Sequence, residues 1–276
     1  MVPELPETET IARDLNASLV GRSIVSLTVT RSDVLREVTA AVFARRVRGR
    51  AVTAVWRRAK LVVLDLDGGD RIVVQPRFTG ALLIDSGALP DAERKFSTLA
   101  LTLDDGRLLH YRDIRRLGTV TLMSPARFAA YAGALGVEPL DPALSPERLS
   151  GLLRGSRQAV KKVLMDQRVI VGIGNIYANE ALWRAGIDPS REARSLSDEE
   201  GVDLLSGVVS VLQESIAARG TSFRDYRDAS GGKGSFGDHL AVYGRGGLPC
   251  PRCGARLVAT HAIDGRTTVF CARCQG

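Results

Sequence analysis

A proline and a carboxylate stand side by side near the start of the chain, at Pro3 and Glu4. An α-amino group has a pKa of about 8, against about 10.4 for lysine, so about a tenth of it is an uncharged nucleophile at neutral pH. A free N-terminal proline is a secondary amine, and its attack on a sugar aldehyde carbon would give a charged iminium. The neighbouring Glu4 could then remove protons and release leaving groups. The pair predicts Schiff-base chemistry, provided that Pro3 is the first residue of the working protein.

All four cysteines lie in the last 27 residues, as two C-x-x-C pairs separated by seventeen residues. This spacing is typical of a zinc ribbon, in which a hairpin brings both pairs onto one ion. We expect hairpin strands at 256–261 and 267–270, with a turn at Asp264 and Gly265. Thiolates favour zinc, and four of them leave no open position for a catalytic water, so a structural ion is expected and an iron or redox site is the alternative. The expected ligands are Cys250, Cys253, Cys271 and Cys274.

Two arginines, Arg115 and Arg116, stand beside the apolar Leu117 at an expected strand end. An arginine can hydrogen-bond an orphaned base while an apolar side chain enters the base stack, as in proteins that distort duplexes. An exposed turn held by salt bridges is the alternative. The glycine-rich turn at 171–175 precedes an expected helix and could present backbone N–H groups to a phosphate.

Length and charge frame these motifs. The 276 residues suggest about two domains, and 38 Lys and Arg against 31 Asp and Glu favour a polyanionic partner, nucleic acid first. The pI near 9.6 agrees with this. Because the start has no secretory pattern and no run of about twenty apolar residues follows, we expect a soluble, intracellular protein. A reducing cytoplasm favours metal ligation over disulfides.

The elements that must position these residues follow from periodicity. A helix is expected at 7–20, ended by Gly21, and β-branched runs separated by turns predict a two-sheet β-sandwich up to residue 122. Helices are expected at 157–166, 177–185 and 198–219. Four glycines in 228–239 leave little to hold the backbone, so a flexible loop is expected there, a lid or a linker. The expected strands are 24–30, 52–56, 61–66, 72–75, 81–84, 99–103, 108–111 and 119–122.

Stretches spread over essentially the whole chain resemble the formamidopyrimidine-DNA glycosylase family of bacterial base-excision repair enzymes. That family has an N-terminal catalytic proline, a helix–two-turn–helix DNA-binding domain and a terminal zinc finger. The matching stretches are Pro3–Glu7, Arg58–Lys60, Asp113–Gly118, Leu164–Glu180, Val242–Arg245 and Arg266–Gln275.

The resemblance implies an α+β multidomain fold: an N-terminal helix with a two-sheet β-sandwich, a helix–two-turn–helix domain and a zinc-ribbon β-hairpin. We expect a catalytic domain at 1–123, a linker at 124–150 with one or two short helices, and a DNA-binding domain at 151–227. A lesion-capping loop at 228–241 and a zinc finger at 242–276 complete the chain.

The resemblance also implies a role for each matched residue. Pro3 resembles the nucleophile that attacks C1′ of the damaged nucleotide, and Glu4 resembles the acid/base. Lys60 and Arg266 are placed in the catalytic group, where they and Asn175 grip phosphates around the everted nucleotide, and zinc takes no chemical part. The expected DNA-binding residues are Phe78, Arg115, Arg116, Leu117, Lys161, Asn175 and Arg245.

The expected reaction is release of an oxidised purine, 8-oxoguanine or a formamidopyrimidine, followed by β- and δ-elimination that cuts the strand. Extruding the nucleotide costs a few kcal/mol, less for a damaged base. We expect damaged double-stranded DNA as partner, one structural zinc ion, no membrane, a monomer, and a place in the bacterial cytoplasm at the nucleoid. The alternatives are an endonuclease VIII-type enzyme for oxidised pyrimidines and a damage-binding protein without activity.

Three positions depart from the family pattern. Val2 is extra, since the family begins Met-Pro. We expect that a GTG codon at position 2 is the true start, that Met1 is an addition, and that Pro3 is exposed by methionine removal; a terminal Val2 would block it. Phe78 lies in a run that differs from the family's, and Leu117 replaces its usual Phe, but both keep an apolar tip for the stack.

Overall fold

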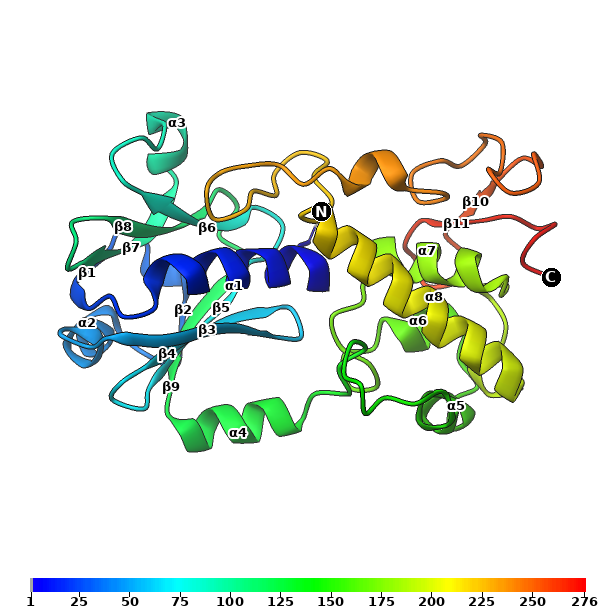
Figure 1. Ribbon diagram of the computed structural model, residues 1–276, viewed down its shortest axis with the longest axis horizontal. Coiled ribbons are helices and arrows are strands. Elements are labelled where there is room, and N and C mark those ends of the chain that lie inside the picture. Colours follow the sequence, from blue (N-terminus) through cyan, green and yellow to red (C-terminus); the bar gives the residue numbers. More distant parts are fainter. Residues whose placement is uncertain (1) are drawn as a thin grey trace. The chain divides into compact units, whose positions relative to one another are not determined.

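The computed structural model describes residues 2–276, so the expectation for Met1 lies outside the described residues. The chain forms two compact units (Figure 1). The first contains the chain up to Gly133 together with Ile216–Gly237, and the second contains Ala134–Ser215 and Asp238–Gly276. The predicted α+β fold class is confirmed, whereas the domain boundaries drawn from the sequence stay predictions.

The first unit begins with helix α1 (Leu5–Leu19), which packs against two strands of a sheet, β3 (Val52–Arg58) and β4 (Leu61–Leu66). Pro6 in the first turn suits a helix start, because an N–H at that position would have no intrahelical acceptor and its absence costs no hydrogen bond. Ile11, Leu15 and Leu19 are fully buried. Their spacing of four residues places them on one face of the helix, so α1 closes the core and fixes Pro3 and Glu4 at its start.

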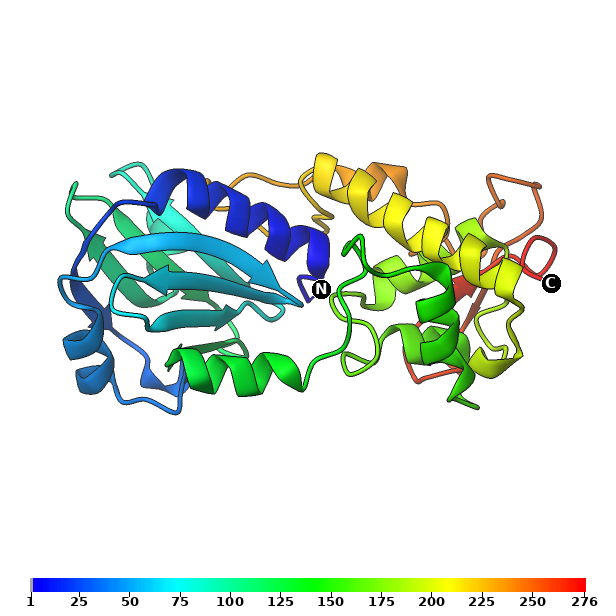
Figure 2. The same ribbon diagram turned by 60° about the horizontal axis from the view of Figure 1, so that its bottom comes forward.

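Two sheets enclose that core (Figure 2). One has the strand order β1-β7-β8-β6 and is antiparallel throughout. The other has the order β2-β9-β5-β4-β3, with only β2 and β9 parallel. Each of the eight predicted strands overlaps an observed one. The remaining bounds are β1 (Ile24–Val29), β2 (Leu35–Arg36), β5 (Arg71–Gln75), β6 (Gly80–Asp85), β7 (Ser97–Leu103), β8 (Leu108–Asp113) and β9 (Thr119–Met123).

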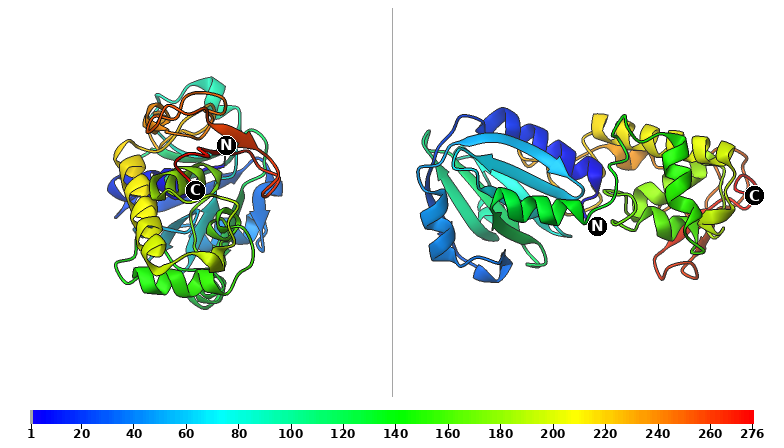
Figure 3. Two further views of the ribbon diagram at one scale, coloured as in Figure 1. Left: turned by 90° about the vertical axis from the view of Figure 1, so that its right-hand side faces the viewer. Right: turned by 90° about the horizontal axis from the view of Figure 1, so that it is seen from below.

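Short helices interrupt the predicted all-β stretch. Helix α2 (Ala40–Val47) is one, capped by the Thr39 hydroxyl and anchored by buried Phe43 and Val47. Helix α3 (Asp91–Arg94) and the 3-10 turn η1 (Ser32–Val34) are others. The sequence predicted the strands of this stretch but not these short helices. Beyond β9, α4 (Pro125–Gly133) packs Phe128 beside Val63, Val73 and Met123 on the face of the five-stranded sheet away from the core (Figure 3).

The second unit is helical and ends in a hairpin. Its helices are α5 (Pro146–Arg154), α6 (Val160–Leu164), α7 (Asn175–Ala185) and α8 (Asp198–Ala217), the last of which runs into the first unit at its end. Two 3-10 turns, η2 (Ala193–Ser195) and η3 (Phe236–His239), lie before and after α8 in the sequence. Strands β10 (Val258–Thr260) and β11 (Thr268–Phe270) pair as predicted, and Gly265 at the turn has φ of 76°. Within residues 2–276, no helix is long and apolar enough to span a bilayer.

The glycine-rich segment 228–239 has more to hold its backbone than predicted. Asp228 accepts hydrogen bonds from the backbone N–H groups of Ser230 and Gly232, and Phe236 N donates to Gly220 O. Phe236 is buried. The expectation that little holds this loop is thus corrected: one buried carboxylate organises it, which glycine content alone conceals.

Candidate active site and nucleic-acid interface

The start of α1 fixes Glu4 in a reciprocal capping box. Glu4 is the N-cap and is 4% exposed; its backbone N–H donates to Glu7 Oε2 at 2.8 Å, and its side chain caps the N–H of Glu7. Pro3 immediately precedes it and is also buried, while Val2 is half-buried. A carboxylate held at a helix N-terminus is stabilised by the helix dipole. The predicted nucleophile and acid/base therefore stand next to each other, at a point where the backbone cannot move independently of α1.

Glu7 also joins this site to the segment that follows α8. Its Oε1 accepts a 2.7 Å hydrogen bond from Thr221 N, and its backbone oxygen accepts one from Tyr226 Oη at 3.4 Å. Gly220 has φ of 85°, and a Cβ there would approach Glu7 to 3.0 Å. Sequence reasoning missed both roles of Glu7. Its spacing of three residues from Glu4 is that of a capping box, but no local pattern links Glu7 to Thr221.

The predicted wedge residues lie on two neighbouring loops of the first unit. Phe78, in the loop between β5 and β6, has φ of 31° and its ring centre lies 4.8 Å from the Arg115 guanidinium carbon. Leu117, in the loop between β8 and β9, is 41% exposed. Arg116 is also exposed and pairs with Asp33 at 2.9 Å. An exposed pair of this kind contributes little to stability, so Arg116 stays a predicted DNA contact.

A buried carboxylate sets the position of the Arg115–Leu117 loop. Asp113 accepts hydrogen bonds from Thr79 Oγ1 at 2.5 Å and from Gly118 N at 2.8 Å, and Thr79 Oγ1 in turn accepts from Arg115 N at 2.9 Å. A Cβ at Gly118 would fall 1.8 Å from the Tyr111 hydroxyl, so this position requires glycine. These hydrogen bonds hold the β5–β6 and β8–β9 loops together. They leave the side chains of Arg115, Arg116 and Leu117 exposed.

Lys60 lies in the turn between β3 and β4, where Ala59 has φ of 55°, and it is half-buried.

Arg245 follows residues 241–243, whose backbone N–H groups bind Glu180 of α7. Its guanidinium Nε is buried and has no hydrogen-bond partner within residues 2–276. Lys60 and Arg245 stay predicted DNA contacts.

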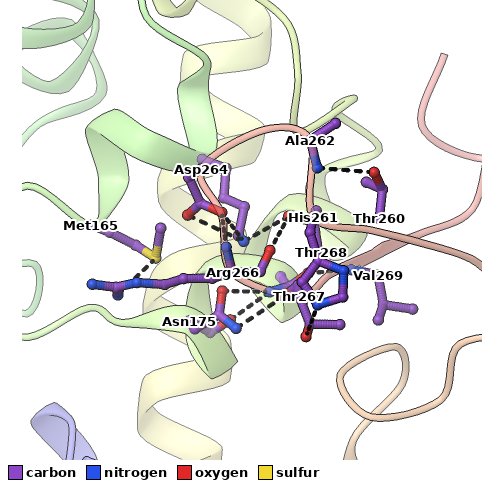
Figure 4. Close-up of polar contacts among 12 residues, drawn as sticks. Met165, Asn175, Thr260, His261, Ala262, Asp264, Arg266, Thr267, Thr268 and Val269 are labelled. Atoms are coloured by element: carbon purple, nitrogen blue, oxygen red, sulfur yellow. Dashed lines mark hydrogen bonds and ion pairs between the residues drawn. The ribbon is translucent and has the colours of Figure 1, made fainter.

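The turn between β10 and β11 lies beside the start of α7 (Figure 4). Asn175, the first residue of α7, donates its side-chain N–H to Thr267 O at 3.0 Å. Arg266 is exposed, its backbone N–H donates to Asp264, and its guanidinium approaches Met165 Sδ to 3.8 Å. Arg266 and Asn175, predicted as phosphate contacts from distant parts of the sequence, are thus brought together by one turn.

The structure places Lys161, a predicted DNA contact, inside the protein. Lys161 on α6 is fully buried, donates to Thr268 Oγ1 at 2.7 Å and pairs with Asp264 at 3.4 Å. A buried ammonium needs such partners because its desolvation is costly. Lys161 therefore fixes the turn that carries Arg266 rather than reaching a phosphate. A basic residue beside other basic residues gives no signal of this in the sequence.

Helix α7 holds the chain on either side of the zinc hairpin. The Glu180 carboxylate accepts three hydrogen bonds of 2.8–2.9 Å from the backbone N–H groups of Ala241, Val242 and Tyr243. Asn179 Oδ1 accepts from Val269 N at 2.7 Å. Glu180 lies in a motif that the sequence identified, but its positioning role was missed, since only the fold brings residues 241–243 to it.

The four cysteines meet at one point, as predicted. Their Sγ atoms all lie within 4.8 Å of one another, with Cys253 and Cys271 at 3.5 Å and Cys250 and Cys274 at 4.0 Å. Zinc bound by four thiolates at about 2.3 Å needs sulfur separations of about 3.8 Å, whereas a disulfide needs about 2.05 Å. The cysteines therefore fit one structural zinc ion, and the apolar cluster around them includes Val242, Leu257 and Val269.

Three family models match consecutive parts of the chain. The formamidopyrimidine-DNA glycosylase N-terminal domain matches residues 2–120, its H2TH domain matches 135–227, and the zinc finger found in FPG and IleRS matches 247–276. A formamidopyrimidine-DNA glycosylase of Roseiflexus sp. is 42% identical over 99% of this chain and 100% of its own length. One from Moorella thermoacetica is 44% identical over 93% of each chain.

Solved structures share the fold. The MutM (Fpg) protein of Thermus thermophilus has a TM-score of 0.86 at 35% identity, covering 99% of both chains. The Lactococcus lactis Fpg in complex with DNA that contains N7-benzyl-Fapy-dG has a TM-score of 0.90 at 30% identity, with the same coverage. The fold, the capped N-terminus and the four-cysteine hairpin together define a DNA glycosylase of base-excision repair that carries a zinc finger. The chain belongs to the formamidopyrimidine-DNA glycosylase family.

Proposed function

We propose that this protein excises oxidised purines, 8-oxoguanine and formamidopyrimidines, from duplex DNA and cuts the strand by β- and δ-elimination through Pro3. The observation that carries the proposal is the buried Glu4 carboxylate, locked by Glu7 directly beside Pro3. The Lactococcus lactis relatives crystallised with Fapy-dG and abasic-site DNA support this choice of substrate.

The reaction needs an unblocked ring nitrogen on Pro3. That nitrogen bonds to C1′ as the C1′–N bond to the base breaks, and the base leaves with a proton. Opening of the sugar ring, with protonation of O4′, gives the iminium. Loss of a proton from C2′ then breaks the C3′–O bond, and loss of a proton from C4′ breaks the C5′–O bond. Water finally releases the amine. In this scheme Glu4 delivers the proton that O4′ gains on ring opening and takes up the proton that C2′ loses.

Strand nicking on three duplexes tests the proposal. One duplex carries 8-oxoguanine, one carries thymine glycol and one is undamaged. Together they separate an oxidised-purine enzyme, an oxidised-pyrimidine enzyme and a binder without activity. We expect nicking at 8-oxoguanine with both elimination products. Nicking at thymine glycol alone, or a gel shift without nicking at either lesion, would overturn it.

Leu117 is proposed to enter the base stack when the damaged nucleotide leaves it. Leu117→Ala is therefore expected to slow excision from an 8-oxoguanine duplex about tenfold, since unstacking is a cost of a few kcal/mol that the wedge offsets. Cleavage of a preformed abasic site should remain. Parallel rate measurements on both substrates check this, and an equal loss on both would refute the wedge role. The exposed Val25→Ala serves as the control.

Arg266 is proposed to grip a phosphate beside the everted nucleotide, together with Asn175. Arg266→Ala should weaken duplex binding about tenfold or more and reduce the slope of log affinity against log salt by about one. Arg168→Ala removes an exposed guanidinium that is instead paired with Asp166 at 2.7 Å, and is the matched control. Fluorescence anisotropy across a salt series measures both; an unchanged slope for Arg266→Ala would contradict a phosphate contact.

A further inference from the structure

Asp228 organises the start of the 228–241 loop, which the family resemblance predicts to cap the everted base. It is 3% exposed. Its Oδ1 accepts hydrogen bonds from Ser230 N at 3.1 Å, Ser230 Oγ at 2.8 Å and Gly232 N at 2.7 Å. Its own backbone N–H donates to Gly232 O at 3.0 Å. The turn at 228–232 is therefore built around this carboxylate.

Arg219 ties that carboxylate to the helix that carries the catalytic pair. Its Nε and one terminal nitrogen donate to Asp228 Oδ2 at 3.0 and 2.6 Å, and the same terminal nitrogen donates to Asp14 Oδ2 on α1 at 2.6 Å. The hydrogen bonds that Arg219 donates to Asp14 and to Asp228 raise the pKa of Arg219 above its usual value. Burial alone would raise the pKa of Asp228, but the bonds from Arg219 and Ser230 hold it below its usual value. Arg219 and Asp228 are thus both charged at neutral pH.

Packing anchors only one end of the turn. Ala229 is buried, and its carbonyl accepts a hydrogen bond from Ile84 N on β6 at 2.9 Å. Ala229, Ser230 and Gly231 line a cavity of about 690 Å³, whose wall on the α1 side includes Ala17 and Ser18. Asp14 and Arg219 line the same cavity. Beside this cavity, Arg219 bridges Asp14 on α1 and Asp228 in the turn.

We propose that Asp14, Arg219 and Asp228 are positioning residues for base recognition: they set the distance between α1 and the 228–232 turn, and so hold the turn over the everted base. This inference rests on the proposed function. A lesion base needs the turn, because it must be held while the bond to C1′ breaks. An abasic site has no base to hold, so its cleavage does not need the turn.

The test compares Arg219→Ala with the wild-type protein on two duplexes, one with 8-oxoguanine and one with a preformed abasic site, in single-turnover reactions. We expect excision of 8-oxoguanine to slow about tenfold, since a displacement of about 1 Å in a positioning group can cost up to a hundredfold. Cleavage of the abasic site should be unchanged within error. Arg219→Lys keeps the charge but not the two-sided geometry, so it should recover part of the loss.

The matched control is Arg127→Ala. Arg127 also belongs to the first unit, holds a bidentate exposed pair with Glu37, and is exposed to 44%, against 46% for Arg219. It should leave both rates unchanged. Asp228→Asn should reproduce the Arg219→Ala defect, and the double variant should be no slower than either single one, because residues of one cluster are not additive.

Two outcomes would overturn the inference. Equal loss on both substrates would show that Arg219 serves only the fold, and an unchanged 8-oxoguanine rate would show that the turn is positioned without the cluster. Thermal melts accompany each variant, and Arg219→Lys carries the comparison if Arg219→Ala does not fold. If the wild-type protein itself fails to excise 8-oxoguanine, the proposed function fails rather than this inference.

Discussion

Glu4→Gln is expected to slow base excision about a thousandfold, within the range of about 10²–10⁴ that a positioned acid/base contributes. The amide cannot deliver the proton that O4′ gains or take up the proton that C2′ loses. It can still accept the capping hydrogen bond that Glu4 accepts at the start of α1, so the helix should keep its start. The measurement is the single-turnover release of 8-oxoguanine from a duplex.

Glu37→Gln is the matched control for this variant, because Glu37 is an exposed carboxylate whose only assigned role is its pair with Arg127. It should excise at the wild-type rate. Melting temperatures for Glu4→Gln and the wild-type protein should agree closely. An active Glu4→Gln protein would remove Glu4 from the chemistry, and an unfolded one would be replaced by Glu4→Asp, which keeps the acid but shortens its reach.

Removal of zinc is expected to weaken duplex binding on the order of a hundredfold. Without the ion the four cysteine sulfurs are no longer held at one point, and the hairpin they hold carries Arg266 and the Thr267 carbonyl that accepts a hydrogen bond from Asn175. Losing a hydrogen bond to a charged group costs about 1.5–3 kcal/mol, and structural zinc sites contribute folding energy directly. Zinc content and anisotropy are measured together after treatment with a chelator.

Restoring one equivalent of zinc should restore binding to the wild-type protein but not to Cys271→Ala, which lacks a buried ligand. The first unit contains none of the cysteines, so its β-sheet signal in circular dichroism should survive the treatment. Full affinity in a protein shown to be free of zinc would contradict the structural role assigned to the ion.

The sequence carried most of the β-sandwich because its strands obey local rules. The β4 run has apolar residues on both faces of the sheet. Turns with glycine at positive φ, such as those at Gly69 and Gly106, separate the strands. Helix α2 escaped prediction because it is only eight residues long, so that its Thr39 cap and the four-residue spacing of Phe43 and Val47 are weak signals.

The parts of the site that sequence reasoning missed depend on contacts between distant residues. Lys161 and Asp264 are 103 positions apart, and their contact lets the lysine hold the turn that carries Arg266. Arg219 and Asp14 are separated by 205 positions. No periodicity or spacing links such pairs. By contrast, the four cysteines announced their ligand by spacing alone, since a C-x-x-C pair encodes local geometry.

The central claim is that the ring nitrogen of Pro3 forms the covalent bond to the sugar. It is tested most directly by borohydride reduction of the protein mixed with an abasic duplex, followed by mass spectrometry of the intact protein and of the cross-linked peptide. We expect a protein that begins at Pro3 and a DNA adduct on that residue. An adduct on a lysine, or efficient trapping by a protein whose mass shows Val2 still in place, would contradict the account.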